Sequence, residues 1–216
     1  CQKVHRKYHK HQCNQDLQYR KKTADSFAKK HHTRKESSDD IDCDNVDNNN
    51  DDDDDKLFQP IPPQDECPIC ALPLPINASM RTYSSCCGNW VCHGCFIENS
   101  RVTLEREQIP CCPFCRKSDP SSENEAVIRI KKRIEMDDSV AIYIASQWYN
   151  LGHNGLPKDL PKAFDLCLQA AELGYSEACG GAAEFYSDGV VIPKDMTKAT
   201  EYFKMAAKKG NIWARH

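Results

Sequence analysis

Three short cysteine motifs decide how the middle of this chain folds: CPIC at Cys67–Cys70, CCGNWVCHGC at Cys86–Cys95 and CCPFC at Cys111–Cys115. Each motif contains two cysteines that are separated by two residues, and the second motif also begins with two adjacent cysteines. A tight turn between such cysteines brings both thiolates to about 2.3 Å from one zinc ion. The spacing therefore predicts zinc sites in this stretch.

The cysteine usage also bears on the cellular compartment. The 14 cysteines could form disulfides, but the C-x2-C spacing favours metal in a reducing compartment, so we expect an intracellular protein. Sites closed by four thiolates have no position for water, so the zinc is predicted to be structural. A domain of about fifty residues buries too little apolar surface to fold unaided, and metal binding supplies the missing free energy. We expect no membrane partner, because no apolar run approaches the roughly 20 residues that span a bilayer.

The segment that precedes the cysteine motifs has two oppositely charged halves. Residues 1–35 are rich in Lys, Arg and His, residues 36–66 are rich in Asp and Glu, and the whole chain has a net charge of -3. Residues 1–60 contain few apolar side chains, which predicts a disordered tail, basic and then acidic. The basic half is either a nuclear-import or nucleic-acid tract or a solvated tail. The sequence does not decide between cytoplasm and nucleus.

The C-terminal part, residues 137–216, contains an internal repeat. Five residues recur after 36 positions: Pro157, Lys158, Asp159, Ala163 and Gly174 return as Pro193, Lys194, Asp195, Ala199 and Gly210. Each unit is predicted to be a helix, a turn that contains glycine, and a second helix. Its aspartate is expected to cap the start of the second helix, and its last glycine to follow that helix with a positive φ.

This pattern resembles the Sel1-like repeat, a relative of the tetratricopeptide repeat. The resemblance rests on the KD–KA–AA–G–A series from Lys158 to Ala178 and on its copy from Lys194 to Ala214. It implies an all-α array of two units and the start of a third, which serves as a scaffold for protein partners. Because two units are few for a stable solenoid, we expect further repeats to follow.

The chain departs from the Sel1 pattern in the first helix of each unit. Ala145-Ser146 and Ala182-Ala183 take the places where the family usually has Leu-Gly. In the second unit, Gly180 and Gly181 fall inside this helix, at a cost of roughly 1 kcal/mol each relative to alanine. We therefore expect this helix to be the weaker one.

The cysteine motifs resemble a RING finger, a small irregular α+β domain in which two zinc ions are held in a cross-brace. The resemblance covers residues 65–118 and implies that the first and third cysteine pairs share one ion, and the second and fourth pairs the other. The implied ligands are Cys67, Cys70, Cys92 and Cys95 for one ion, and Cys86, Cys87, Cys112 and Cys115 for the other. The common RING pattern would place a ligand at Asn89, so the partner of Cys87 stays open between Cys86 and Asn89, although zinc chemistry favours the thiolate. Cys111 and His93 are predicted to lie outside both sites.

RING fingers of the ubiquitin-ligase type bind a ubiquitin-conjugating enzyme through a shallow apolar patch. Ile69, Pro113 and Arg116 match the hydrophobe, the proline and the basic residue of that patch. The resemblance implies an E3 ubiquitin ligase in which Arg116 orients ubiquitin on its conjugating enzyme, with no catalytic residue in the ligase itself. Many active RING fingers have a tryptophan shortly after the sixth ligand. This chain has FIENSRVTL at residues 96–104, where Phe96, Ile97 or Leu104 would have to replace it.

The complete prediction is a modular protein. A disordered tail (residues 1–60) is followed by a zinc domain (residues 65–118), a linker with the start of a helix (residues 119–136) and the helical repeats (residues 137–216). In the linker, Val127, Ile130 and Ile134 recur at helical spacing. The predicted partners are a conjugating enzyme with ubiquitin and a protein bound by the repeats. A non-catalytic zinc-dependent adaptor and a protein that binds nucleic acid through the basic tail are the alternatives.

Overall fold

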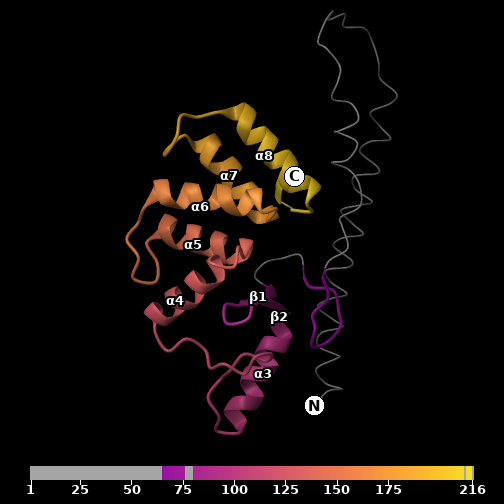
Figure 1. Cartoon of the computed structure of the whole chain (residues 1–216). Coiled ribbons are helices and arrows are strands. Elements are labelled where there is room, and N and C mark those ends of the chain that lie inside the picture. The colour runs from indigo at the N-terminus through magenta and orange to yellow at the C-terminus, as the bar shows by residue number, and fades with distance from the viewer. Residues whose placement is uncertain (1–64, 76–79, 212, 216) are drawn as a thin grey trace, which may run out of the picture.

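The computed structural model describes residues 65–75, 80–211 and 213–215 (Figure 1). The predicted disorder of residues 1–60 lies outside these residues. The elements, in chain order, are β1 (Arg81–Ser84), β2 (Asn89–Cys92), α3 (His93–Glu105), α4 (Glu123–Ile134), α5 (Ser139–Leu151), α6 (Leu160–Glu172), α7 (Ser176–Asp188), α8 (Met196–Lys208) and the 3-10 helix η4 (Trp213–Arg215). In the described part of the chain, no helix is both long enough and apolar enough to cross a membrane.

The cysteine-rich part is a small module built on one β-hairpin. Strands β1 and β2 pair antiparallel, with Arg81 opposite Cys92 and Ser84 opposite Asn89. The buried residues of its core are Cys67, Leu74, Val91, Cys92 and Cys95, against which Trp90, Phe96 and Phe114 pack. More than half of the buried core residues are cysteines, so apolar burial alone gives this module little stability.

Helix α4 joins the cysteine-rich module to the repeats. It begins at Glu123, where the side chain of Ser122 accepts a hydrogen bond from the amide of Glu125 (3.2 Å). Val127 and Ile130 are buried, as the helical spacing predicted. Ile130 packs with the first helix of the repeats and with Tyr83 of β1, so α4 contacts both parts of the protein.

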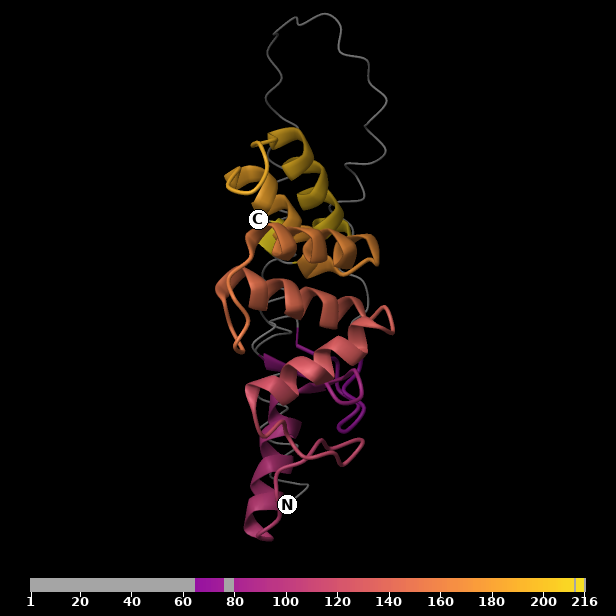
Figure 2. The same cartoon turned by 60° about the vertical axis from the view of Figure 1, so that its left-hand side comes forward.

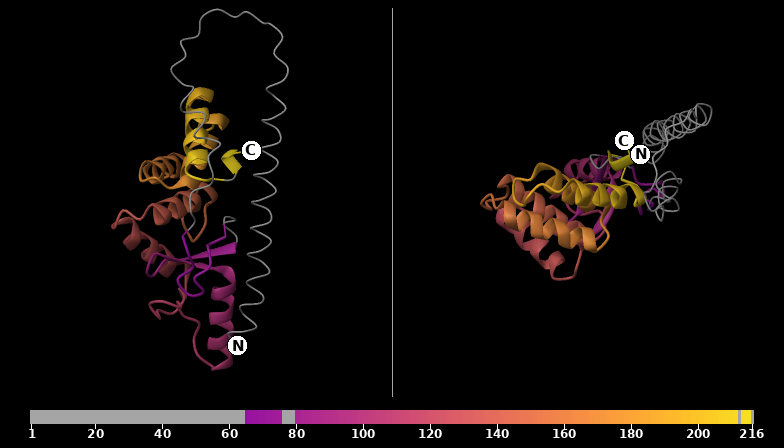
Figure 3. Two further views of the ribbon diagram at one scale, coloured as in Figure 1. Left: turned by 90° about the vertical axis from the view of Figure 1, so that its right-hand side faces the viewer. Right: turned by 90° about the horizontal axis from the view of Figure 1, so that it is seen from above.

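The repeats are two helical hairpins, α5–α6 and α7–α8, which stack in succession after α4 (Figures 1 and 2). The predicted caps are confirmed: Asp159 accepts from the amide of Lys162 (3.1 Å) and Asp195 from that of Lys198 (3.0 Å). The glycines that follow α6 and α8 have positive φ angles, of 94° and 89°. Figure 3 shows that α3 extends away from this stack.

Small residues line the contacts between the repeat helices. Ala170, Ala178, Ala182 and Ala206 are completely buried together with Ile142. Aromatic rings fill the wider gaps, for example Phe164 against Phe185 with centroids 5.4 Å apart. The family departure at Ser146 is explained by a buried hydrogen bond of 2.7 Å, which the hydroxyl donates to the carbonyl of Ala163.

The two glycines of α7 have different surroundings, although the helix runs through both. A Cβ at Gly181 would lie 3.0 Å from Cys167 Sγ and 3.3 Å from Tyr143 Cε2, so the close packing of α5, α6 and α7 requires glycine there. A Cβ at Gly180 would meet only the Asn211 amide, at 3.6 Å. No close packing therefore offsets the helix stability that Gly180 loses relative to alanine.

We expect Gly180→Ala to raise the free energy of unfolding by about 0.5–1 kcal/mol, because alanine restricts the unfolded chain and has room in the helix. Gly181→Ala is the matched variant and should lower it by about 1 kcal/mol or more, because its Cβ would lie 3.0 Å from Cys167 Sγ and 3.3 Å from Tyr143 Cε2. Urea unfolding followed by circular dichroism measures both. Equal effects at the two positions would contradict the packing role of Gly181.

Candidate metal centre

The first group of cysteines is Cys67, Cys70, Cys92 and Cys95, whose sulfurs all lie within 4.8 Å of one another. The first two lie in the turn that precedes β1, the third ends β2, and the fourth lies in the first turn of α3. Three of the four are almost fully buried, with exposed fractions of 0–2%. The sulfurs of Cys70 and Cys92 are 3.8 Å apart.

The second group is Cys86, Cys87, Cys112 and Cys115, also with sulfurs within 4.8 Å of one another. The first two lie in the turn between β1 and β2, and the other two in the loop after α3. The sulfur separations are 3.7 Å for Cys87 and Cys112, and 3.3 Å for Cys115 and Cys86. One hairpin therefore supplies two cysteines to the second group from its turn and one cysteine to the first group from its end.

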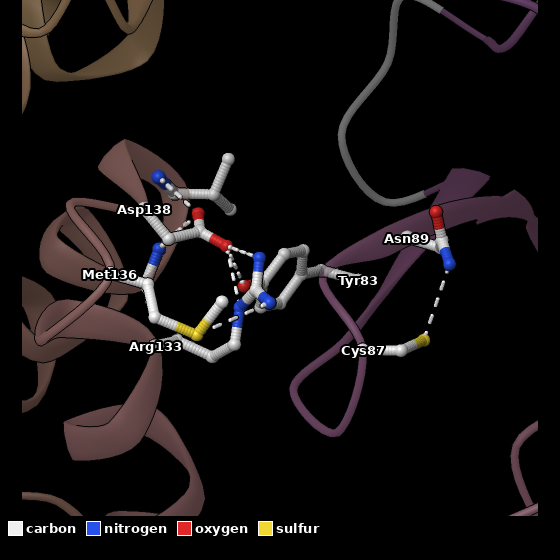
Figure 4. A network of polar contacts seen from close by, with 8 residues as sticks. Tyr83, Cys87, Asn89, Arg133, Met136 and Asp138 are labelled. Carbon is white, nitrogen blue, oxygen red and sulfur yellow. Dashed lines mark hydrogen bonds and ion pairs between the residues drawn. The ribbon is translucent and has the colours of Figure 1, made fainter. Parts of the chain in front are cut away.

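Asn89 lies beside the second group without joining it. Its side-chain amide donates a hydrogen bond of 3.4 Å to Cys87 Sγ (Figure 4). The structure thus brings Cys86, and not Asn89, together with Cys87, Cys112 and Cys115. Cys111 and His93 lie outside both groups, and the carbonyl of Cys111 accepts a hydrogen bond from Asn99 (2.7 Å).

The two groups could each hold a metal ion, and their geometry is compatible with zinc. Four sulfurs at about 2.3 Å from a tetrahedral zinc ion are about 3.8 Å from one another, close to the 3.3–3.8 Å separations of the three pairs above. In the second group, burial raises the pKa of Cys86 and of Cys87, whereas at Cys112 hydrogen bonds from the amides of Cys115 and Phe114 and from the side chains of Ser84 and Cys86 together outweigh burial and lower the pKa to about 7. Metals bind the thiolate form, so Cys112 is the cysteine of this group whose environment favours that form.

The three residues that match a conjugating-enzyme patch lie on the two loops that supply cysteine pairs. Ile69 is 46% exposed, Arg116 is exposed and Pro113 is half-buried. Within the described residues, Arg116 forms no ion pair. On α3, Ile97 and Leu104 are exposed at 52% and 62%, whereas Phe96 packs on the module's core.

A cleft of about 300 Å³ separates the cysteine-rich module from the repeats. Arg81 and Trp90 of the hairpin line one side, and Tyr175, Glu177 and Trp213 line the other. Arg81 and Glu177 form an ion pair across it. This cleft could not be predicted from the sequence, because its two walls are about a hundred residues apart in the chain and share no motif.

Comparisons with known proteins identify the helical part. The Sel1 repeat family matches residues 139–175 and 176–211. A search of curated proteins found no match.

Two solved structures resemble the chain. One is a protective antigen of uropathogenic Escherichia coli strains that displays an SLR fold (21% identity, TM-score 0.40, 44% of this chain and 20% of that one). The other is a Sel1 repeat protein from Oxalobacter formigenes (23% identity, TM-score 0.41, 56% of this chain and 82% of that one). The chain thus spans about a fifth of the length of the first. By the family match, residues 139–211 are two consecutive Sel1 repeats.

Proposed function

We propose that this protein is a RING-type E3 ubiquitin ligase, in which two structural zinc ions hold the module that binds a ubiquitin-conjugating enzyme. The Sel1 repeats act as the protein-interaction scaffold, a role that the repeat family suggests. The observation that carries the ligase proposal is the exposure of Arg116 and Ile69 on the loops of the paired cysteine groups. An exposed guanidinium can bridge two carbonyls with its planar fork.

The proposed mechanism is positioning. The apolar side chain of Ile69, with Pro113, contacts the conjugating enzyme, and Arg116 donates hydrogen bonds to that enzyme and to ubiquitin. The thioester is thereby held in a reactive conformation, and an acceptor lysine attacks it. The ions supply rigidity only, since four thiolates leave no coordination position for a reactant.

The test is the discharge of ubiquitin from loaded conjugating enzymes to free lysine, with the zinc-loaded protein and a panel of such enzymes. We expect acceleration that falls at least tenfold in Ile69→Ala and in Arg116→Ala, because each removes a contact that orients the thioester. Arg106→Ala is the matched control, since Arg106 is another exposed arginine of the same module and lies outside the patch. No acceleration across the panel, from protein shown to hold two zinc ions, would contradict the proposal.

A zinc-dependent adaptor is the second candidate. The observation in its favour is that Arg81 and Glu177 join the cysteine-rich module to the repeats, as a binding platform of two parts would require. An adaptor predicts capture of partners without discharge. Nucleic-acid binding through the basic tail concerns residues outside the described part, and it would show as strongly salt-dependent binding by residues 1–35.

A further inference from the structure

A polar cluster lies between the β1–β2 turn, which carries Cys86 and Cys87, and the start of the first Sel1 repeat. It consists of Tyr83 on β1, Arg133 on α4 and Asp138 at the start of α5 (Figure 4). Oδ2 of Asp138 accepts hydrogen bonds from the Tyr83 hydroxyl (2.7 Å) and from Nε of Arg133 (2.8 Å). Its Oδ1 accepts from the amides of Val140 and Ala141 (3.1 and 3.3 Å), which caps α5. The Asp138 carboxylate thus binds the hairpin and α4 through Oδ2 and caps α5 through Oδ1.

The guanidinium of Arg133 also lies against the loop that carries Cys86 and Cys87. Gly88, the next residue, has a φ of +76°, and a Cβ there would lie only 2.5 Å from Arg133 Cζ. The arginine therefore occupies the space beside the loop where a side chain of residue 88 would stand. It reaches this position while bound to Asp138, so the loop, α4 and α5 meet at this arginine.

The ion pair of the cluster is largely buried, with exposed fractions of 20% for Arg133 and 11% for Asp138. Burial disfavours the charged form of Asp138, but the hydrogen bonds from Tyr83 and Arg133 outweigh it and lower the pKa of this carboxyl. Removal of Arg133 would leave this carboxylate buried and without its cation, which is strongly unfavourable. Removal of Arg133 should therefore destabilise both the β1–β2 turn and the start of α5.

We propose that Arg133 and Asp138 are positioning residues for the second metal site, and that they link metal binding there to the folding of the first Sel1 repeat. This inference rests on the proposed binding of metal by the two cysteine groups. Groups that hydrogen-bond a metal's ligands commonly change metal affinity by 10- to 100-fold; Arg133 would act one step further out, through the backbone at Gly88 next to Cys87. Because linkage is reciprocal, a metal that depends on this contact must in turn stabilise the start of α5.

The first experiment measures metal retention at each group separately. The zinc-loaded full chain is titrated with a chelator and treated with iodoacetamide, and peptide mass spectrometry reports the alkylation of each cysteine. In Arg133→Ala, we expect Cys86, Cys87, Cys112 and Cys115 to react at a chelator concentration at least tenfold lower than in the wild type. The other group should be unchanged. Lys132→Ala is the control, since it removes the same charge from an exposed neighbouring residue of α4.

A second variant separates positioning from helix capping. Asparagine caps a helix about as well as aspartate, so Asp138→Asn keeps the cap of α5 and loses the charge that holds Arg133. We expect the second group to lose metal as readily as in Arg133→Ala. The double variant should be little worse than either, because both changes break one contact.

Hydrogen exchange measures the reciprocal effect, which is the stabilisation of the start of α5 by bound metal. Stripping the metal from the wild type should accelerate exchange at Val140 and Ala141, and this acceleration should shrink in the double variant.

Native mass spectrometry of the wild type counts the bound ions. Two ions, with equal retention in Arg133→Ala and Lys132→Ala, would overturn the linkage and leave metal binding intact. A weakening of both groups alike would show general destabilisation and also overturn it. An absence of bound ions would overturn the metal proposal itself, and the linkage with it.

Discussion

Cys95→Ser is expected to unfold the cysteine-rich module, residues 65–118, whereas Cys111→Ser leaves it folded. Cys95 is 2% exposed, lies in the first turn of α3 and contributes its sulfur to the first group. Cys111 lies outside both groups. A structural zinc site contributes about 10–16 kcal/mol of binding free energy, which exceeds what a core this small supplies. The loss of one ligand should therefore cost more than the whole stability of the module.

Hydrogen exchange across β1, β2 and α3 is the measurement, with zinc counted in the same samples. The exchange of Cys95→Ser should match that of the wild type stripped by a strong chelator. The helices from α6 to α8 should remain protected, because their core consists of their own side chains, among them Ala170, Ala182 and Ala206. A Cys95→Ser protein that keeps two ions and a protected hairpin would refute the assignment of this cysteine as a ligand.

The helical half could be predicted from the sequence in some detail. Its boundaries are set by local chemistry, since Asp159 caps a helix and Gly174 adopts a positive φ wherever the rest of the chain lies. The register of the repeat then fixed which alanines meet. The gathering of the cysteines into two groups of four followed from a resemblance, because spacing alone does not say which pair joins which.

The contacts between the two halves could not be predicted in this way. Tyr83 and Asp138 are 55 residues apart, and Arg81 and Glu177 are 96 apart. A polar residue in a strand and another at a helix start are ordinary on their own, and only the fold brings them together. The same holds for Gly181, where the sequence predicts a weak point of the helix but Cys167 and Tyr143 pack closely enough to require glycine.

The second large effect is expected from Glu177→Ala, which should lower the free energy of unfolding by about 2–3 kcal/mol, since a largely buried charge loses its partner. The side chain of Arg81 is 14% exposed, and its Cζ lies 4.8 Å from the centroid of the Trp90 ring. Among the described residues, its Nε has no hydrogen-bond partner. Without Glu177, the guanidinium would keep the cost of burial and lose the carboxylate that offsets it.

Urea unfolding followed by circular dichroism measures this cost, and Glu201→Ala is the control, because Glu201 is an exposed glutamate of α8. The control should change the free energy of unfolding by less than about 0.5 kcal/mol. The double variant Arg81→Met/Glu177→Leu should recover most of the loss, because apolar side chains of similar size replace a buried ion pair at little cost. If Glu177→Ala and Glu201→Ala had equal effects, the ion pair would not hold the two halves together. If the double variant is as stable as the wild type while Glu177→Ala is not, the ion pair adds no net stability. Its role is then to fix the orientation of the cysteine-rich module relative to the repeats.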